Sequence, residues 1–209
     1  VRMSLFDMLL RCLATGMPDQ FPAGHFGSIC GTVISGFHPD HGRRFTLVEP
    51  QMGGWGAFRG RDGTDAMFSL THGDPYRCPA EICEARYGID VERVALNTMP
   101  GGSGQWRGGR GLSVDYRFRS QAELAIGYSK ARVPPWGLAG GADGSVNFVE
   151  VEKKSGACSR YASASGIVLD AGDLVRIRTG SGGGWGRSHD RRKSAISDDQ
   201  RNGFLSIST

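Results

Sequence analysis

Glycine is the residue that most constrains this chain. It occupies 33 of the 209 positions, about twice its usual share of roughly 7%. The glycines follow no collagen-like period, and many gather in short clusters at residues 53–56, 101–104, 108–111 and 180–186. Because glycine has no Cβ atom, such clusters predict turns, bulges and places where the backbone approaches another group closely.

Length and composition allow a packed core. The chain is long enough for one substantial domain or two small ones, and 39% of its residues are hydrophobic. The formal charge is +4, with much of the excess in residues 187–193, so composition does not indicate a nucleic-acid partner. Residues 107–111 read Arg-Gly-Gly-Arg-Gly, as in RNA-binding tails, but they lead directly into a predicted strand, which favours a turn.

Cysteine usage bears on the compartment. Five cysteines without a Cys-x-x-Cys pair fit a reduced, cytoplasmic protein better than a disulfide scaffold. No apolar run approaches the roughly 20 residues needed to span a bilayer, and Arg2, Asp7 and Arg11 interrupt the only stretch that resembles a signal peptide. The chain begins with Val1, directly in a helical pattern, so we interpret it as a fragment or a trimmed chain.

Two segments have helical features. The first, residues 3–16, places apolar residues at helical spacing, and it is expected to pack on the following sheet or on another chain. These apolar residues are Leu5, Met8, Leu9, Cys12 and Leu13. The second segment, residues 79–87, starts with a proline and is followed by Gly88, which suits the left-handed position after a helix.

Strands are predicted from residues that alternate between apolar and polar. Residues 112–119 and 124–128 alternate on both sides of a short polar turn, which predicts an antiparallel hairpin. Residues 43–49 predict another strand, with Phe45 and Leu47 on one side. Further strands are expected at residues 91–96, 146–151, 166–169 and 174–179. The sequence therefore predicts an α+β fold, mainly antiparallel β with about two helices.

Composition divides the chain at residue 186. Residues 1–186 contain every predicted helix and strand, and we expect them to form the folded part. Residues 187–209 are polar, charged and rich in serine, which predicts a disordered or loosely attached tail.

A Gly-Gly-Trp-Gly motif occurs twice, and its residues are our candidates for ligand binding or an interface. They are Gly53, Gly54, Trp55, Gly56, Gly183, Gly184 and Trp185. Successive glycines can turn their N–H groups toward an anion, and a tryptophan can form the wall of a pocket. A tight turn with a core tryptophan explains the same pattern. Neither copy is a nucleotide-binding phosphate loop, since no Gly-Lys-Ser/Thr follows.

The first copy opens a loop that carries charge. Residues 53–63 follow a predicted strand, and Arg59, Arg61 and Asp62 come shortly after Trp55. Loops after strands often carry function, and a pocket for a polar ligand or a partner chain needs a few polar groups on an apolar wall. We therefore predict that this loop lies at a pocket or subunit seam, with Trp55 as its wall and Arg59 and Asp62 at its edge.

Candidate catalytic residues are few. They are Asp62, His72 and Asp74, of which His72 suits a general base oriented by Asp74. A polar loop that caps a helix explains the last two residues as well, and we favour that interpretation. Cys78 precedes a helix, where a thiolate is stabilised, but a packed cysteine is the commoner arrangement. His38, Asp40 and His41 are crowded into one loop, so we predict no metal site.

Four segments in order resemble the hydantoinase B/oxoprolinase family. Residues 52–63 are similar to its GGGWGA…G-x-DG segment, and residues 78–87 to its N-x-PxExxEARYP-like helix. Residues 101–111 look like its GG-x-G-x-[WY]-RGG-x-G segment, and residues 171–186 like its terminal GD…GGGG[WY]G element. Each motif is weak alone, but four in the family order, over about residues 3–186, are fairly specific.

The resemblance implies ATP-dependent processing of cyclic amides such as hydantoins or 5-oxoproline, and related members are subunits of ATP-dependent ketone carboxylases. In such systems an A-type subunit or domain binds ATP, with Mg, and phosphorylates the substrate. The B-type part completes a shared active site and carries a metal site in its N-terminal half. The resemblance covers only the C-terminal third or so of a B-type subunit. It thus implies an A-type partner, the missing N-terminal B-type half and no cofactor in this chain itself.

The chain departs from the family pattern at several positions. Met52 replaces a glycine of the first motif, Phe68 and Leu70 stand where many members have a histidine pair, and Arg187-Ser188 replaces the usual Asp-Pro. We therefore carry over no catalytic role. Two alternatives to a part of an enzyme stay open, namely a non-catalytic β-rich binding or assembly domain and an inactive product of a truncated gene.

Overall fold

The structure, a computed structural model, describes residues 2–73 and 75–204. They form two antiparallel sheets and three α-helices, which confirms the predicted α+β class and adds one helix to it. The elements are α1 (Arg2–Gly16), β1 (Gly31–Phe37), β2 (Arg44–Glu49), α2 (Ala80–Tyr87), β3 (Ile89–Leu96), β4 (Leu112–Phe118), β5 (Ala122–Gly127), β6 (Phe148–Glu152), β7 (Cys158–Tyr161), β8 (Ser163–Leu169), β9 (Leu174–Arg178) and α3 (Lys193–Arg201), with short 3-10 turns at Pro18–Gln20 and Ser188–Asp190.

The two sheets enclose the hydrophobic core. One has four strands in the order β2-β1-β5-β8 and the other five in the order β3-β4-β9-β6-β7. Ile34 and Leu124 from the first sheet and Val114, Val149 and Ile177 from the second are fully buried in one apolar cluster. The alternation along β2 and β4 therefore identified the core-facing side correctly, since the predicted apolar positions of both strands are buried.

The predicted hairpin of β4 with β5 is wrong, although both strands form. β4 pairs with β3 and β9, whereas β5 pairs with β1 and β8, so the short turn between them carries the chain from one sheet to the other. Alternation reports which side of a strand meets the core, and both strands do face that core. It does not report which strand lies alongside, because that depends on distant segments.

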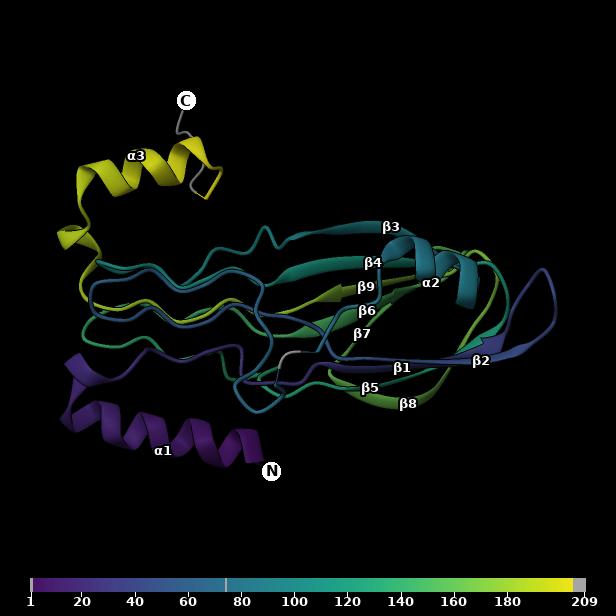
Figure 1. Ribbon diagram of the computed structural model, residues 1–209, viewed down its shortest axis with the longest axis horizontal. Helices are drawn as coiled ribbons and strands as arrows, with labels where there is room; N and C mark the ends of the chain where they lie inside the picture. The colour runs from purple at the N-terminus through teal and green to yellow at the C-terminus, as the bar shows by residue number, and fades with distance from the viewer. Residues whose placement is uncertain (1, 74, 205–209) are drawn as a thin grey trace.

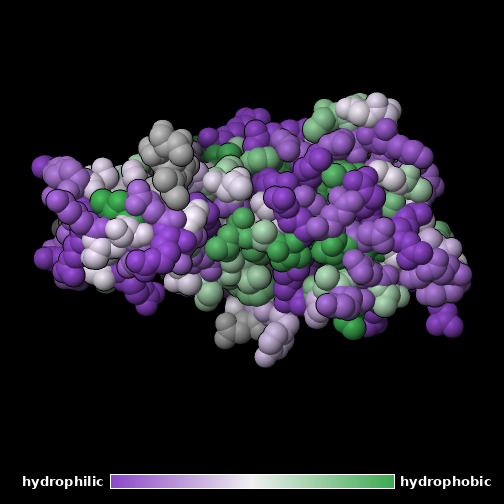
Figure 2. All heavy atoms as spheres, turned by 90° about the horizontal axis from the view of Figure 1, so that it is seen from above, coloured by the Kyte–Doolittle hydropathy of each residue, from purple (hydrophilic) through white to green (hydrophobic). Residues whose placement is uncertain are grey.

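β3 is an edge strand whose inner side is partly uncovered. Val94 and Leu96 pair with Val114 and Leu112, so their side chains point to the same side of the sheet as these core residues. They are nevertheless 45% and 41% exposed. Figure 2 shows hydrophobic residues gathered across the middle of the face on the side of the molecule where β3 and α3 lie.

The glycine clusters form a second structural unit beside the sheets, which we call the glycine layer. It consists of residues 23–24, 53–57, 63–66, 101–111, 135–145 and 180–186. Figure 1 shows it as extended segments running side by side on the left, away from the strand arrows. Most of its hydrogen bonds join backbone N–H groups to backbone carbonyls of other segments.

Segment 180–186 lies at the centre of this layer. Its backbone exchanges hydrogen bonds with residues 24, 54–57, 102–109 and 138–142, at N···O distances of 2.8–3.2 Å. One of them runs from the N–H of Gly182 to Gly109 O at 2.8 Å. A strand in a sheet has two neighbours, so contacts to four other segments describe a bundle of extended chains. Such packing satisfies the hydrogen-bonding N–H and carbonyl groups of the backbone without forming a sheet.

Only glycine fits at the contact points of the bundle. A Cβ atom on Gly54 would lie 2.0 Å from the carbonyl oxygen of Gly109, and one on Gly182 would lie 2.0 Å from that of Trp55. Both distances are far below van der Waals contact. The neighbouring atoms are backbone and cannot rotate away, so the high glycine content is a packing requirement of this unit.

The two ends of the described chain bear differently on their predictions. The predicted apolar face of α1 is exposed to solvent, so it does not pack on the sheets, and its packing on another chain stays a prediction. In place of the predicted disordered tail, residues 188–204 contain a 3-10 turn and α3, and Asp199 within α3 is buried. A polar composition misleads here because the buried groups of this segment are charges with partners and not apolar side chains.

Glycine packing leads to a direct test. We expect Gly182→Ala to lower the free energy of unfolding by about 3 kcal/mol, the upper range for overpacking, because no side-chain movement relieves the contact with Trp55 O. Gly127→Ala is the matched control, since nothing lies within 4 Å of a Cβ atom there and its φ is not positive. Chemical denaturation of both variants measures the difference. Equal stability of the two would contradict the packing requirement.

Candidate functional site

The two Gly-Gly-Trp-Gly copies are far apart in sequence but adjacent in space. The N–H of Gly54 donates to Gly180 O, and the N–H of Ala57 donates to Gly183 O, each at 2.9 Å. Both copies therefore lie in the glycine layer, with the second copy at its centre. The sequence selected both copies as candidates but did not indicate that they form one structure.

Their N–H groups are already engaged. Gly53 donates to Met67 O and Gly54 to Gly180 O, while Gly183 and Gly184 donate to Gly24 O and Ala142 O. Each hydrogen bond has an N···O distance of 2.8–2.9 Å. An anion-binding nest needs free N–H groups that converge on one point. These donors point into neighbouring chains, so the motif contributes packing in place of a phosphate cradle.

The two tryptophans anchor the layer to its surroundings. Trp55 is half-buried, and its Nε1–H donates to Phe68 O at 2.9 Å. Trp185 is 7% exposed, donates to Pro18 O at 3.0 Å and packs edge-on against Trp106. Each indole thus has an apolar environment for its ring and a carbonyl for its N–H.

Trp55 also borders a small cavity of about 30 Å³ beneath α1. The imidazole of His25 lies there, edge-on to Trp55 with ring centroids 6.3 Å apart, and is only 5% exposed. Its Nε2 has no hydrogen-bond partner among the described residues. Burial lowers the pKa of His25 to about 4, with a smaller lowering from Lys130 and an opposing effect of Asp7, so the ring is neutral near pH 7.

The largest cleft of the described residues lies between the glycine layer and α3. Its volume is about 690 Å³. Glycine backbone around residues 101–104 and 142–145 forms one wall, and Ile196 and Phe204 from the C-terminal segment form another. Arg107, Arg110 and Arg191 also line it. The cleft combines apolar surface with guanidinium groups, which suits a small polar ligand or an apolar side chain from a partner.

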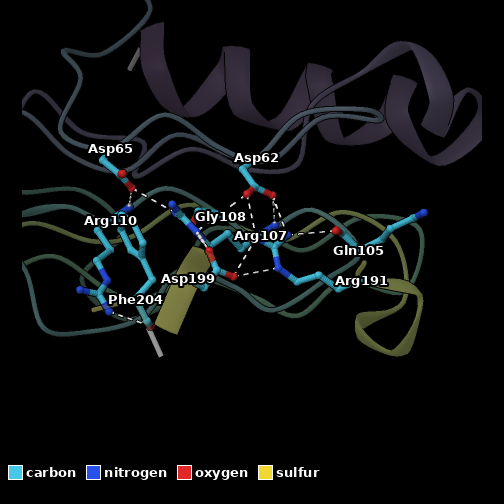
Figure 3. Close-up of polar contacts among 9 residues, drawn as sticks. All are labelled: Asp62, Asp65, Gln105, Arg107, Gly108, Arg110, Arg191, Asp199 and Phe204. Carbon is cyan, nitrogen blue, oxygen red and sulfur yellow. Dashed lines mark hydrogen bonds and ion pairs between the residues drawn. The ribbon is translucent and has the colours of Figure 1, made fainter. Parts of the chain in front are cut away.

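Asp62 sits beside this cleft in a closed ion network (Figure 3). Its carboxylate accepts two hydrogen bonds from the Arg191 guanidinium and one from the backbone N–H of Arg107, all at 2.8 Å. Partial burial acts to raise the pKa of Asp62, but these hydrogen bonds and the two guanidinium charges outweigh burial and lower it. Such a carboxylate is ionised and fully engaged, which makes it a weak general base.

Asp199 of α3 completes the network. It is 5% exposed and accepts hydrogen bonds from Arg107 Nε at 3.1 Å and Arg191 Nε at 2.8 Å. The Arg107 guanidinium also stacks on the Phe204 ring, 3.6 Å from its centroid. These contacts fasten the C-terminal segment to residues 62 and 107, as Figure 3 shows. No local sequence pattern indicates this attachment, because residues 62 and 107 are far from the C-terminal segment along the chain.

The remaining candidates lie elsewhere. Arg59 is exposed and forms an ion pair with Asp19, while the half-buried ring of His72 stacks on Phe68. Asp74 lies outside the described residues, so the predicted pair with His72 stays a prediction. Burial and the nearby carboxylate of Glu49 raise the pKa of Cys78, which favours the packed cysteine over a stabilised thiolate.

Glu49 belongs to a buried polar cluster that the sequence analysis missed. It is 2% exposed and accepts hydrogen bonds from Tyr116 Oη at 2.5 Å and from the backbone N–H of Cys78 at 2.8 Å. Burial and Glu49 raise the pKa of Tyr116. The only sequence signal was an acidic residue at a core-facing position of β2. The cluster joins β2 and β4 to the start of α2 and is closed off from solvent.

Two features are not found in the part of the chain that the structure describes. No group of three or more histidine, cysteine, aspartate or glutamate side chains is placed to hold a metal ion. None of the helices there has the length and apolarity needed to cross a membrane.

The fold and the glycine motifs agree with a known family. The family model described as hydantoinase B/oxoprolinase matches residues 1–188. The chain belongs to the hydantoinase B/oxoprolinase family. α3 lies beyond the matched residues, so the ion network joins a segment outside the match to the glycine layer within it.

Individual relatives extend this assignment. The chain is 29% identical to an uncharacterised protein of Methanocaldococcus jannaschii over 97% of this chain and 35% of the relative. It is 27% identical to caprolactamase subunit beta of Pseudomonas jessenii over 98% of this chain and 36% of that subunit. The crystal structure of the ATP-dependent caprolactamase from Pseudomonas jessenii shares the fold, with a TM-score of 0.80 and 22% identity over 93% of this chain and 35% of that chain. The chain thus spans about a third of these proteins.

The ion network predicts how the C-terminal segment is held. We expect Arg191→Met to release residues 188–204. It breaks the buried pair of Arg191 with Asp199, a loss of roughly 3–5 kcal/mol, and it removes the guanidinium that pairs with the half-buried Asp62. Hydrogen exchange of the α3 amides should then become fast while the sheets stay protected. Arg201→Met, whose pair with Asp198 is exposed, is the control. Unchanged protection of α3 in Arg191→Met would contradict the role of the network.

His25 predicts a pH dependence of stability. Its pKa of about 4 in the folded chain lies below the unfolded value of about 6.5, so its contribution is complete above pH 6.5 and is lost as the pH falls toward 4. The expected loss is about 3 kcal/mol from the linkage relation. Denaturation at several pH values should show that His25→Leu removes this pH-dependent part of the free energy of unfolding. His189→Ala, at an exposed histidine, should leave it unchanged. If the stability of wild type and of His25→Leu changed with pH in the same way, the predicted contribution of His25 would be wrong.

Proposed function

We propose that this chain is the C-terminal part of a hydantoinase B/oxoprolinase-type subunit in an ATP-dependent cyclic-amide hydrolase. The family match over residues 1–188 carries the proposal. Hydantoin and 5-oxoproline represent the substrate class. Caprolactam, for which the relative from Pseudomonas jessenii is named, is also a cyclic amide. The choice between hydrolase and carboxylase chemistry depends on parts of the assembly outside this chain.

The chain supplies structure and binding surface, and its partners supply the chemistry. Its candidate acid, Asp62, is engaged by three hydrogen bonds, and the N–H groups of Gly53, Gly54, Gly183 and Gly184 are occupied by carbonyls. Neither feature suits phosphate binding or proton abstraction. We therefore assign ATP and Mg to an A-type subunit or domain and expect the N-terminal B-type half to complete the shared site.

Within that assembly the glycine layer is the rigid platform. Trp55, Arg59 and Asp62 lie at its margin, and Arg59 is exposed, so this margin is the part available to substrate or to the partner. The remaining candidates act indirectly, because they fix the backbone that positions this margin. They are Gly53, Gly54, Gly56, Gly183, Gly184 and Trp185. All five cysteines are free thiols, which fits assembly in the reducing cytoplasm.

A non-catalytic assembly domain is the second candidate. The closed ion pairs of Asp62 and Asp199 favour it, because they describe a fastening and not a reactive centre. The two proposals differ in whether the chain, placed in a complete subunit, supports turnover.

The assay uses the isolated chain and a chimera. With ATP and Mg²⁺, the isolated chain should open hydantoin, 5-oxoproline or caprolactam no faster than a protein-free control. In the chimera, this chain replaces the matching region of caprolactamase subunit beta from Pseudomonas jessenii, and the A-type partner is added. We expect the chimera to hydrolyse caprolactam in the presence of ATP faster than a form of the subunit that lacks this region. A folded, assembled chimera without turnover would favour the assembly domain, and turnover by the isolated chain would refute dependence on partners.

A further inference from the structure

Helix α1 is fixed to the molecule by a charged residue. Asp7 is 6% exposed, and its carboxylate pairs with Lys130 Nζ at 2.6 Å and accepts a hydrogen bond from Trp136 Nε1 at 3.0 Å. Met3 and Ala14 are buried on the same side of the helix, one turn before and two turns after Asp7. This stripe sets the rotation of α1, because turning the helix would strip a buried carboxylate of its partners.

The opposite side of α1 is apolar and uncovered. Leu5, Met8, Leu9 and Leu13 are 56%, 63%, 54% and 46% exposed, and Cys12 is exposed among them. We call these five residues the outer face of α1. In Figure 1 the helix lies along the lower side of the molecule with nothing beyond it. A continuous apolar stripe at helical spacing on a surface marks an interaction site.

We propose that the outer face of α1 is the docking surface for the N-terminal region of the B-type subunit. The inference rests on the proposed function and names the surface that holds the two parts together. This chain covers 35% of the caprolactamase chain, so most of such a subunit lies outside the matched region and is available to cover the face. Leucine and methionine side chains at this spacing fit an apolar groove or a second helix.

The occupant is an extensive apolar surface and not a charged ligand. The five residues of the outer face carry no charge, and the neighbouring Arg11 is exposed at its margin. Buried between two bodies, these side chains form the apolar centre of an interface with a polar rim. A second copy of this chain is the competing occupant, and the experiment distinguishes it.

Two exposed cysteines provide a built-in probe. Cys12 lies on the outer face of α1 and Cys158 on β7, a different part of the molecule, while Cys30 and Cys83 are buried. Both exposed thiols of the isolated chain should react readily with N-ethylmaleimide, read by peptide mass spectrometry. In the chimera with the caprolactamase N-terminal region, alkylation of Cys12 should slow by about ten-fold or more, with Cys158 unchanged. Equal Cys12 rates in the isolated chain and the chimera would overturn the proposal.

Charge substitutions on the outer face of α1 provide a second test. Leu9→Glu combined with Leu13→Glu should leave the melting temperature of the isolated chain unchanged, because both side chains are exposed, and should restore Cys12 reactivity in the chimera. Val168→Glu, an equally exposed apolar residue on β8, is the control and should leave Cys12 protected. Protection of Cys12 that appears in the isolated chain and rises with its concentration would overturn the proposal in favour of self-association.

The outcomes separate the two proposals. A chimera that hydrolyses caprolactam while Cys12 remains reactive would overturn the docking surface and leave the function standing. A chimera with Cys12 protected but without turnover would support the docking surface and count against the function.

Discussion

Backbone-to-backbone packing in the glycine layer is the constraint on which the rest of the structure depends. Segment 180–186 is hydrogen-bonded to four other segments, and a side chain at Gly54 or Gly182 would collide with a carbonyl. With N–H and carbonyl groups satisfied inside the bundle, extended chains can pack without forming a sheet. The layer in turn positions Trp55 and forms one wall of the largest cleft.

Charged residues attach the peripheral helices to this layer. Asp7 of α1 and Asp199 of α3 are both buried. Asp7 pairs with Lys130, and Asp199 pairs with Arg107 of the glycine layer and with Arg191 of its own C-terminal segment. A buried carboxylate is costly unless it is paired, so these contacts fix where the helices lie more strictly than apolar packing would. The consequence differs at the two sites. α3 closes over the cleft, whereas α1 is left with its apolar side facing outward.

Among the described residues, the outer face of α1 and the inner side of β3 at Val94 and Leu96 are apolar surfaces that remain exposed. The relatives from Methanocaldococcus jannaschii and Pseudomonas jessenii are about three times as long as the matched region, because it covers 35–36% of each. In the proposed assembly these exposed side chains contact the remainder of a subunit. Near the cleft, Asp62 and Asp199 form ion pairs with Arg107 and Arg191, whereas the Arg110 guanidinium donates to the carbonyl of Phe204.

The sequence by itself determined the α+β class, the core-facing sides of β2 and β4, the helix α2 with Gly88, and the family, because alternation, capping residues and glycine spacing are local patterns. It also selected the two Gly-Gly-Trp-Gly copies. Only the tertiary structure decided that these copies pack together, that β4 and β5 belong to different sheets and that residues 188–204 are fastened by Asp199. The physical reason is the same in each case. Strand pairing, backbone packing and buried ion pairs join residues that are distant in the chain, and a pattern within one segment carries no record of its partner.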